Sequence, residues 1–292
     1  MPCQLRWVAS VPASALHAAE ALARGLPLAD ERLATALAEP AAALMQLDLP
    51  RTTLWRHLVP LSATIDNNRQ LAEVTLARVL GRGAPAEALI DPLARAVGLA
   101  EQAVLRWSPD LPQQLELRSR PLREQWEARG PGMLHAIGRW TDPALLVAQA
   151  DLLVVPPALG GGGAAHLLYN SVRIEAVLAH PHPELPETVR LAWLLSQLNS
   201  DLPRYGERIH ADRLAWVSAL ALTPPALCAA QEVQLAVNTP MLLKKALATW
   251  QVEGRSAADL ADRVSDWWDV YQATRPTWQV ALTALDQLLV ED

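Results

Sequence analysis

A run of four glycines at residues 160–163 most constrains the fold, because it separates two strand-like segments in a chain that otherwise has helical periodicity. Before it, residues 152–155 are an apolar run (Leu-Leu-Val-Val) that is typical of a buried strand. After it, residues 172–176 (Val-Arg-Ile-Glu-Ala) alternate apolar and charged side chains, as in a strand with two different faces. We therefore predict that residues 152–178 form a β-hairpin whose strands pair across a loop of about fifteen residues.

Most of the remaining chain predicts helices. Between residues 12 and 107, apolar side chains recur every three or four positions in several short segments, and Gly25 and Gly81 occupy positions where helices end. Beyond Pro186 the pattern is helical to the last residues. The sequence therefore predicts a mostly α protein of the α+β class, a multi-helix bundle with a small central β-hairpin or short sheet.

Prolines are predicted to set the ends of several helices, because proline lacks the backbone N–H that a helix interior needs. Asp30 is expected to cap a helix that ends at Pro40. The Thr-Pro pairs that begin at Thr223 and Thr239 should each start a further helix, with the threonine as the cap and the proline in the first turn.

The middle of the chain predicts a change in organisation. Residues 114–118 (Gln-Leu-Glu-Leu-Arg) alternate as in a short half-buried strand, and a Gly-Pro-Gly sequence at residues 130–132 is expected to interrupt the helical pattern that follows. We therefore divide the chain into an N-terminal helical bundle, residues 1–110, and a second part, residues 111–292. The second part is an α+β segment (residues 111–182) that continues into C-terminal helices.

Composition and charge argue against several functions. The 292 residues carry 31 Asp and Glu against 25 Lys and Arg, for a formal net charge of −6, whereas a nucleic-acid surface needs clustered positive charge. No run approaches the ~18 apolar residues that span a bilayer. Cys3 and Cys228 are too few for a disulfide framework, and only Lys244 and Lys245 among the basic residues are lysine. We predict a soluble, cytoplasmic, bacterial protein with no nucleic-acid partner and no membrane contact.

Polar side chains gather just after the glycines. The residues that we single out as a ligand-binding set are His166, Tyr169, Asn170, Arg173 and, on the following helix, Arg190. They offer an imidazole, a hydroxyl, an amide and two guanidinium groups, which can bind an anion and supply an acid and a base. We predict that they line one concave surface beside the glycine loop and bind a small anionic ligand. The alternative is an exposed hairpin with no cleft beneath it.

The helix predicted after Pro186 has one polar side. Its polar residues fall at i, i+3, i+10 and i+14 opposite a stripe of leucines: Glu187, Arg190, Gln197 and Asp201. Because an amphipathic helix turns its apolar stripe to the core, these side chains are expected to face solvent or a cleft.

Two closely spaced histidines raise the question of a metal site. His180 and His182, with His166 and a nearby glutamate, could supply three ligands for zinc. However, residues 180–183 (His-Pro-His-Pro) favour a polyproline conformation, in which side chains two positions apart do not line up. We predict no metal site and no cofactor, and metal binding by these three histidines stays an open question.

The leading functional hypothesis is a helical binding or assembly module without catalysis, with a protein partner or self-association. The alternative is a hydrolase-like enzyme, metal-dependent or a degenerate relative of the metallopeptidases, with its site around residues 156–190. A strand hairpin followed by a helix is the order of elements seen in zinc metallopeptidases. The His-Glu-x-x-His motif of those enzymes is absent, and the predicted helix carries Glu-Thr-Val-Arg-Leu from Glu187 onward. Neither a nucleophile nor a catalytic triad can be assigned from residue spacing.

Overall fold

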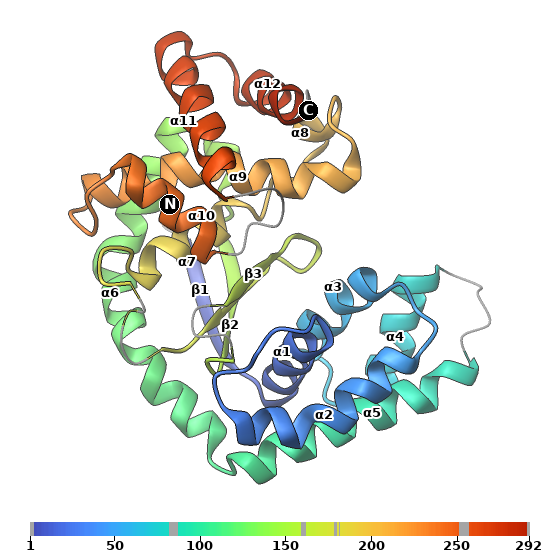
Figure 1. Cartoon of the computed structure of the whole chain (residues 1–292). Helices are drawn as coiled ribbons and strands as arrows, with labels where there is room; N and C mark the ends of the chain where they lie inside the picture. The colour runs from blue at the N-terminus through green and yellow to red at the C-terminus, as the bar shows by residue number, and fades with distance from the viewer. Residues whose placement is uncertain are drawn as a thin grey trace.

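The computed structural model describes residues 3–81, 87–158, 162–177, 180, 182–250 and 257–290. Within these residues the chain is mostly helical and contains one four-stranded sheet. The predicted class, mostly α with a small central sheet, is confirmed. Figure 1 shows the sheet at the centre, with helices α1–α5 grouped at the lower right and helices α9–α12 at the top.

The elements follow one another along the chain in this order: β1 (Gln4–Ala9), α1 (Val11–Ala23), α2 (Glu31–Gln46), α3 (Arg51–Leu61), α4 (Asn68–Leu80), α5 (Glu87–Trp107), α6 (Leu111–Trp140), the 3₁₀ turn η1 (Pro143–Leu145), β2 (Gln149–Val155), β3 (Gly163–His166), the 3₁₀ turn η2 (Leu167–Tyr169), β4 (Ser171–Glu175), α7 (Glu187–Ser196), α8 (Pro203–Gly206), α9 (Ala211–Glu232), α10 (Pro240–Thr249), α11 (Ala257–Thr274) and α12 (Trp278–Val290).

The sheet has the strand order β1-β2-β4-β3, and its pairing corrects the predicted hairpin. The two predicted strands do pair, as β2 and β4, but they run parallel, with Leu152 opposite Val172. Parallel neighbours need a crossover connection, and the chain between them provides one that includes β3. The observed hairpin is β3–β4, which is antiparallel, with Ala165 opposite Val172. Gly160 and Gly161 lie outside the described residues.

The two faces of the sheet differ in polarity. Val172 and Ile174 of β4 are buried on one face within the large core that also contains α6 and α7. Because side chains alternate along a strand, Arg173 and Glu175 lie on the opposite face. That face is covered by α1, whose polar side chains pair with both residues. The alternation is therefore as predicted, and the polar face is buried.

Two hydrophobic cores meet at the N-terminal helices. One core is formed by the apolar stripes of α1–α5, and the other surrounds the sheet and the helices that follow it. Helices α1, α2 and α5 contribute side chains to both cores, for example Leu16 to the first and Ala15 to the second. The boundary at residue 110 stays a prediction.

Several helices continue through prolines that were predicted to end or start them. Asp30 caps α2 as predicted, accepting from Arg32 N at 2.8 Å, but the helix continues past Pro40. Pro224 lies inside α9 and does not open a new helix. An interior proline costs roughly 3 kcal/mol of helix stability. Both prolines are buried, so apolar packing offsets this cost. The cap at Thr239 is confirmed and begins α10.

Helix α9 is also the one described helix that is long and apolar enough to cross a membrane by length and composition. Within the described chain, 78% of its most apolar window is buried inside the protein. A core helix of a globular protein passes the same test, so this helix is weak evidence for a membrane span.

The predicted strand at residues 114–118 and the predicted break at residues 130–132 are both wrong, because α6 runs through them without interruption. Leu115, Leu122 and Trp126 are buried at helical spacing, while Leu117 is exposed. Gly130 serves packing: a Cβ atom built there would lie 2.4 Å from Cδ2 of the Trp126 ring. Position 130 of α6 needs a glycine because the buried indole of Trp126 lies against the backbone of the same helix there.

Replacing Gly130 with alanine is therefore expected to lower the free energy of unfolding by about 1–3 kcal/mol, as overpacking does, although alanine is the better helix former. Gly98→Ala in α5 is the matched control, because its nearest neighbour would be Asn68 Nδ2 at 3.4 Å. That variant should gain roughly 0.5–1 kcal/mol. Urea denaturation measures both. Equal stabilisation by the two alanines would contradict the packing role of Gly130.

Candidate functional site

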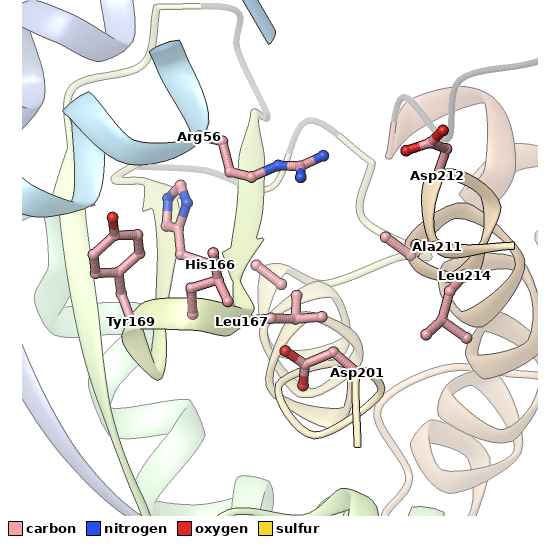
Figure 2. A pocket seen from close by; sticks show the side chains of 11 residues that line it. Arg56, His166, Leu167, Tyr169, Asp201, Ala211, Asp212 and Leu214 are labelled. Atoms are coloured by element: carbon pink, nitrogen blue, oxygen red, sulfur yellow. The ribbon is translucent and has the colours of Figure 1, made fainter. Parts of the chain in front are cut away.

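A cavity of about 250 Å³ lies where the two groups of helices meet the edge of the sheet. Its walls come from α3, from β3 with η2, from the turn before α8 and from the first turn of α9. Figure 2 shows Arg56 of α3 reaching across the top of the cavity, His166 and Tyr169 standing on one side, and Asp212 of α9 on the other side, with Asp201 below. The floor between them includes Leu167 and Leu214.

The cavity has a charged rim and an apolar interior. Arg56 carries one positive charge, and Asp201 and Asp212, below and on the other side of the cavity, carry two negative charges. All three side chains belong to exposed residues. His166 is buried, and burial, with the nearby Arg173 and His17, holds its pKa well below the usual value. The imidazole is therefore neutral at pH 7, and the formal charge of the cavity lining is −1.

His166 is polar, buried and short of a partner. The residue is 7% exposed, and its Nε2 atom has no hydrogen-bond partner in the described part of the chain. Buried polar atoms without partners are uncommon in folded proteins and each needs an explanation. Tyr169, beside it, is held in place by a hydrogen bond between its hydroxyl and Nδ1 of His57 at 2.6 Å.

The strand that borders this cavity, β3, has an open edge. Glu175 N–H donates to Gly162 C=O at 3.2 Å, so these two residues occupy a hydrogen-bonded position of the β3–β4 ladder. Hydrogen-bonded and non-bonded pairs alternate in an antiparallel ladder. The N–H and C=O groups of Gly163 and Ala165 therefore point away from β4. No described strand pairs with β3 on that side, and Ala165 lines the cavity.

Behind β3, a cluster of ionisable side chains is buried between α1, β4 and α7. His17 Nε2 lies 2.9 Å from Glu175 Oε1, and Arg173 lies 2.8 Å from Glu20. Burial and the charge of Arg173 lower the pKa of His17. Burial acts to raise the pKa of Glu20, but Arg173 outweighs it and the pKa falls. This cluster links the N-terminal helices to the sheet.

The second ion pair of the cluster lies within α7, where Glu187 and Arg190 are in contact and both are buried. Burial raises the pKa of Glu187 and lowers that of Arg190. The desolvation of both groups therefore outweighs their attraction, as is common for buried ion pairs. The prediction that the polar side of the predicted helix faces solvent or a cleft is wrong for Glu187, Arg190 and Gln197, which are buried, whereas Asp201 is exposed as predicted. The amide of Gln197 donates to Trp193 C=O at 3.1 Å.

The described glycines explain why the glycine run is needed. A Cβ atom on Gly162 would lie 2.8 Å from Glu175 Oε1, and one on Gly163 would lie 3.0 Å from both Arg173 O and Leu194 Cδ1. Glycine allows the backbone to approach other groups this closely. These two residues therefore fit the chain between the buried cluster and α7.

The structure divides the predicted ligand-binding set instead of gathering it on one surface. His166 and Tyr169 line the 250 Å³ cavity. Asn170 lies in the left-handed conformation between η2 and β4, and its amide donates to Gln149 C=O at 2.7 Å. Arg173 lines a separate cavity of about 30 Å³, and Arg190 pairs with Glu187. Ligand binding by this set stays a prediction, and of its members only His166 and Tyr169 line the 250 Å³ cavity where they could contact a ligand.

Metal and nucleophile chemistry find little support in the described residues. Across the described ranges, no three His, Cys, Asp or Glu side chains are arranged to hold a metal ion. His180 instead accepts a hydrogen bond from Glu187 N–H at 3.2 Å. Burial raises the pKa of Cys3 to about 11 and also raises that of Cys228, so both thiols are protonated and unreactive at pH 7.

The residues that sequence reasoning missed are Arg56 and Asp212 in the cavity, and His17 and Glu20 in the buried cluster, whereas Asp201 was predicted to face solvent or a cleft and does line the cavity. The chain matches no known protein-family model, no curated protein and no solved structure. The geometry of the site therefore carries the functional argument by itself.

Proposed function

We propose that this protein is a non-catalytic binding module that takes an extended segment of a partner protein as an added strand along β3. The observation that carries the proposal is the outward direction of the Gly163 and Ala165 backbone groups beside a cavity. An open strand edge offers a row of donors and acceptors to another chain, and a neighbouring pocket adds side-chain specificity. The cavity volume of about 250 Å³ suits one large side chain of such a segment.

The short described length of the β3 edge supports binding of a specific partner over self-aggregation. β3 has four residues, Gly163–His166, and proteins use short edge strands to limit unwanted pairing. A partner must therefore gain affinity from the cavity as well as from the backbone. This combination of backbone bonds and one side-chain pocket is the mode seen when peptides add to sheets.

A hydrolytic alternative is less well supported. His17 and Glu175 form a hydrogen-bonded imidazole–carboxylate pair, which is an arrangement suited to a general base. Both groups are buried, and the cavity beside His17 has a volume of about 30 Å³. That volume holds one or two water molecules but no substrate. The pair therefore fits a structural role.

The proposal is tested by selecting binders from a random linear peptide library and measuring their affinity by fluorescence anisotropy. Ala165→Pro removes the outward N–H and leaves the β3–β4 ladder intact, since proline is tolerated at an edge when its N–H would face away from the sheet. The loss of one backbone bond and the bulk of the ring should weaken binding about tenfold. Ala165→Val keeps the donor and is the matched control.

A second measurement does not depend on the folding of any variant. N-methylation of a selected peptide, one residue at a time, should weaken binding at alternate positions, because only every second N–H of an added strand faces β3. If the library yields no binders, or if binders tolerate N-methylation at every position, strand addition is wrong.

A further inference from the structure

We infer that the side chain received by the cavity is a lysine or arginine of the partner segment, an inference that rests on the proposed strand addition along β3. The net formal charge of the lining is −1, with Asp201 and Asp212 against Arg56 and with His166 neutral. A basic side chain would neutralise this charge. An acidic one would bring a third carboxylate to a cavity that already holds two.

The shape of the cavity fits a charge carried on an apolar stem. Leu167, Leu168 and Leu214 line the interior, and Leu168 is 64% exposed, which is high for a large apolar residue. Lysine and arginine side chains cover apolar surface with their methylene groups while the charged end stays near water. The stem would lie on the leucines and the charged end would reach the exposed carboxylates.

The positions of the charged residues also set the orientation of the partner's basic side chain in the cavity. Figure 2 shows Arg56 and Asp212 on opposite sides of the cavity, with Asp201 below. Within the described residues Arg56 has no carboxylate partner, and Asp201 has no cationic partner. Asp212 contacts His210 at 3.5 Å, and both of these side chains are exposed. The entering cation is therefore repelled by α3 and attracted toward α9.

The test compares three versions of one selected peptide that differ at the residue that enters the cavity: lysine, norleucine and glutamate. Each is titrated into the wild-type protein and the double variant D201N/D212N by fluorescence anisotropy. Because exposed ion pairs are individually weak, the double variant should bind the lysine peptide about three- to tenfold more weakly. It should bind the norleucine peptide unchanged and the glutamate peptide more tightly.

The control variant is Asp269→Asn, which removes an exposed carboxylate of α11 that does not line the cavity. It should leave all three affinities unchanged, and raising the salt concentration should weaken only the lysine peptide. If the lysine and norleucine peptides respond alike to D201N/D212N, the basic-side-chain inference is overturned, while the alternate N-methylation pattern still decides strand addition separately. If N-methylation does not weaken binding at alternate positions, the proposed strand addition is wrong, whichever side chain the cavity prefers.

Discussion

Replacing Arg190 with methionine is expected to lower the free energy of unfolding by about 3–5 kcal/mol, the usual result of removing one partner from a buried ion pair. Arg190 is 2% exposed and Glu187 is 6% exposed, so water cannot replace the lost guanidinium. Methionine keeps most of the volume, which limits any contribution from a cavity. Urea denaturation at pH 7 measures the change.

The control is an exposed ion pair in the same protein. Arg32 contacts Asp30 at 3.5 Å with 87% of the arginine side chain exposed, and Arg32→Met should cost less than about 1 kcal/mol. The double variant R190M/E187Q should recover part of the loss, because it removes the unpaired carboxylate. A loss for Arg190→Met no larger than that for Arg32→Met would show that Glu187 is not left as an uncompensated buried charge.

The fold class followed from the sequence because helical periodicity and the alternation of residues 172–176 are local signals. The direction of strand pairing did not follow, because it depends on partners far apart in the chain. β1 pairs with β2 in parallel, with Trp7 opposite Leu152. Nothing in the sequence of either segment indicates that the other is its pairing partner. β3 was hidden in a glycine-rich segment that shows no strand periodicity. Without these two strands, a hairpin was the simplest arrangement.

The predicted helix end at Pro40 and the predicted break at Gly130 were wrong for one physical reason. Their intrinsic cost inside a helix is fixed, but the packing that offsets it is tertiary and cannot be read locally. Pro40 and Gly130 both occupy buried positions in continuous helices. The same Thr-Pro signal gave a helix start at Thr239, where the cap was confirmed, but not at Thr223, where Pro224 lies inside α9.

The candidate site was predictable only in part. His166 and Tyr169 were singled out by their chemistry and do line the cavity. Asp201 was predicted to face solvent or a cleft and lines the cavity, but Arg56 comes from a distant helix, and Arg56 and Asp212 are each one exposed charged residue among many. The buried cluster had a usable signal: His17 and Glu20 lie three positions apart on an otherwise apolar helix, which predicts a polar stripe. The sequence does not show that this stripe faces Arg173, because that contact depends on how β4 packs against α1.

Lowering the pH from 7.5 to 5.5 is expected to lower the free energy of unfolding by about 2–3 kcal/mol through His17 and His166. Burial lowers the pKa of both side chains in the folded state. The unfolded chain then binds protons that the folded chain does not, so stability is present above the usual histidine pKa of about 6.5 and is lost as the pH falls below it. Each histidine that stays neutral contributes about 1.4 kcal/mol over this range.

The pH dependence is assigned by variants and denaturation curves collected across this range. Glu187 works in the opposite sense, because a raised carboxyl pKa adds stability as the pH falls, so the slope of the wild type alone is not diagnostic. The double variant H17Q/H166N removes both of these imidazoles and keeps Glu187, His57 and His180, so its slope should be much shallower than that of the wild type. His210→Gln, at an exposed position, should keep the wild-type slope. If the double variant keeps it too, the two imidazoles titrate alike in the folded and the unfolded chain. His166 would then become charged as the pH falls through about 6.5. Below that pH the cavity lining would be neutral instead of negative, which would remove the electrostatic basis for a basic partner side chain there.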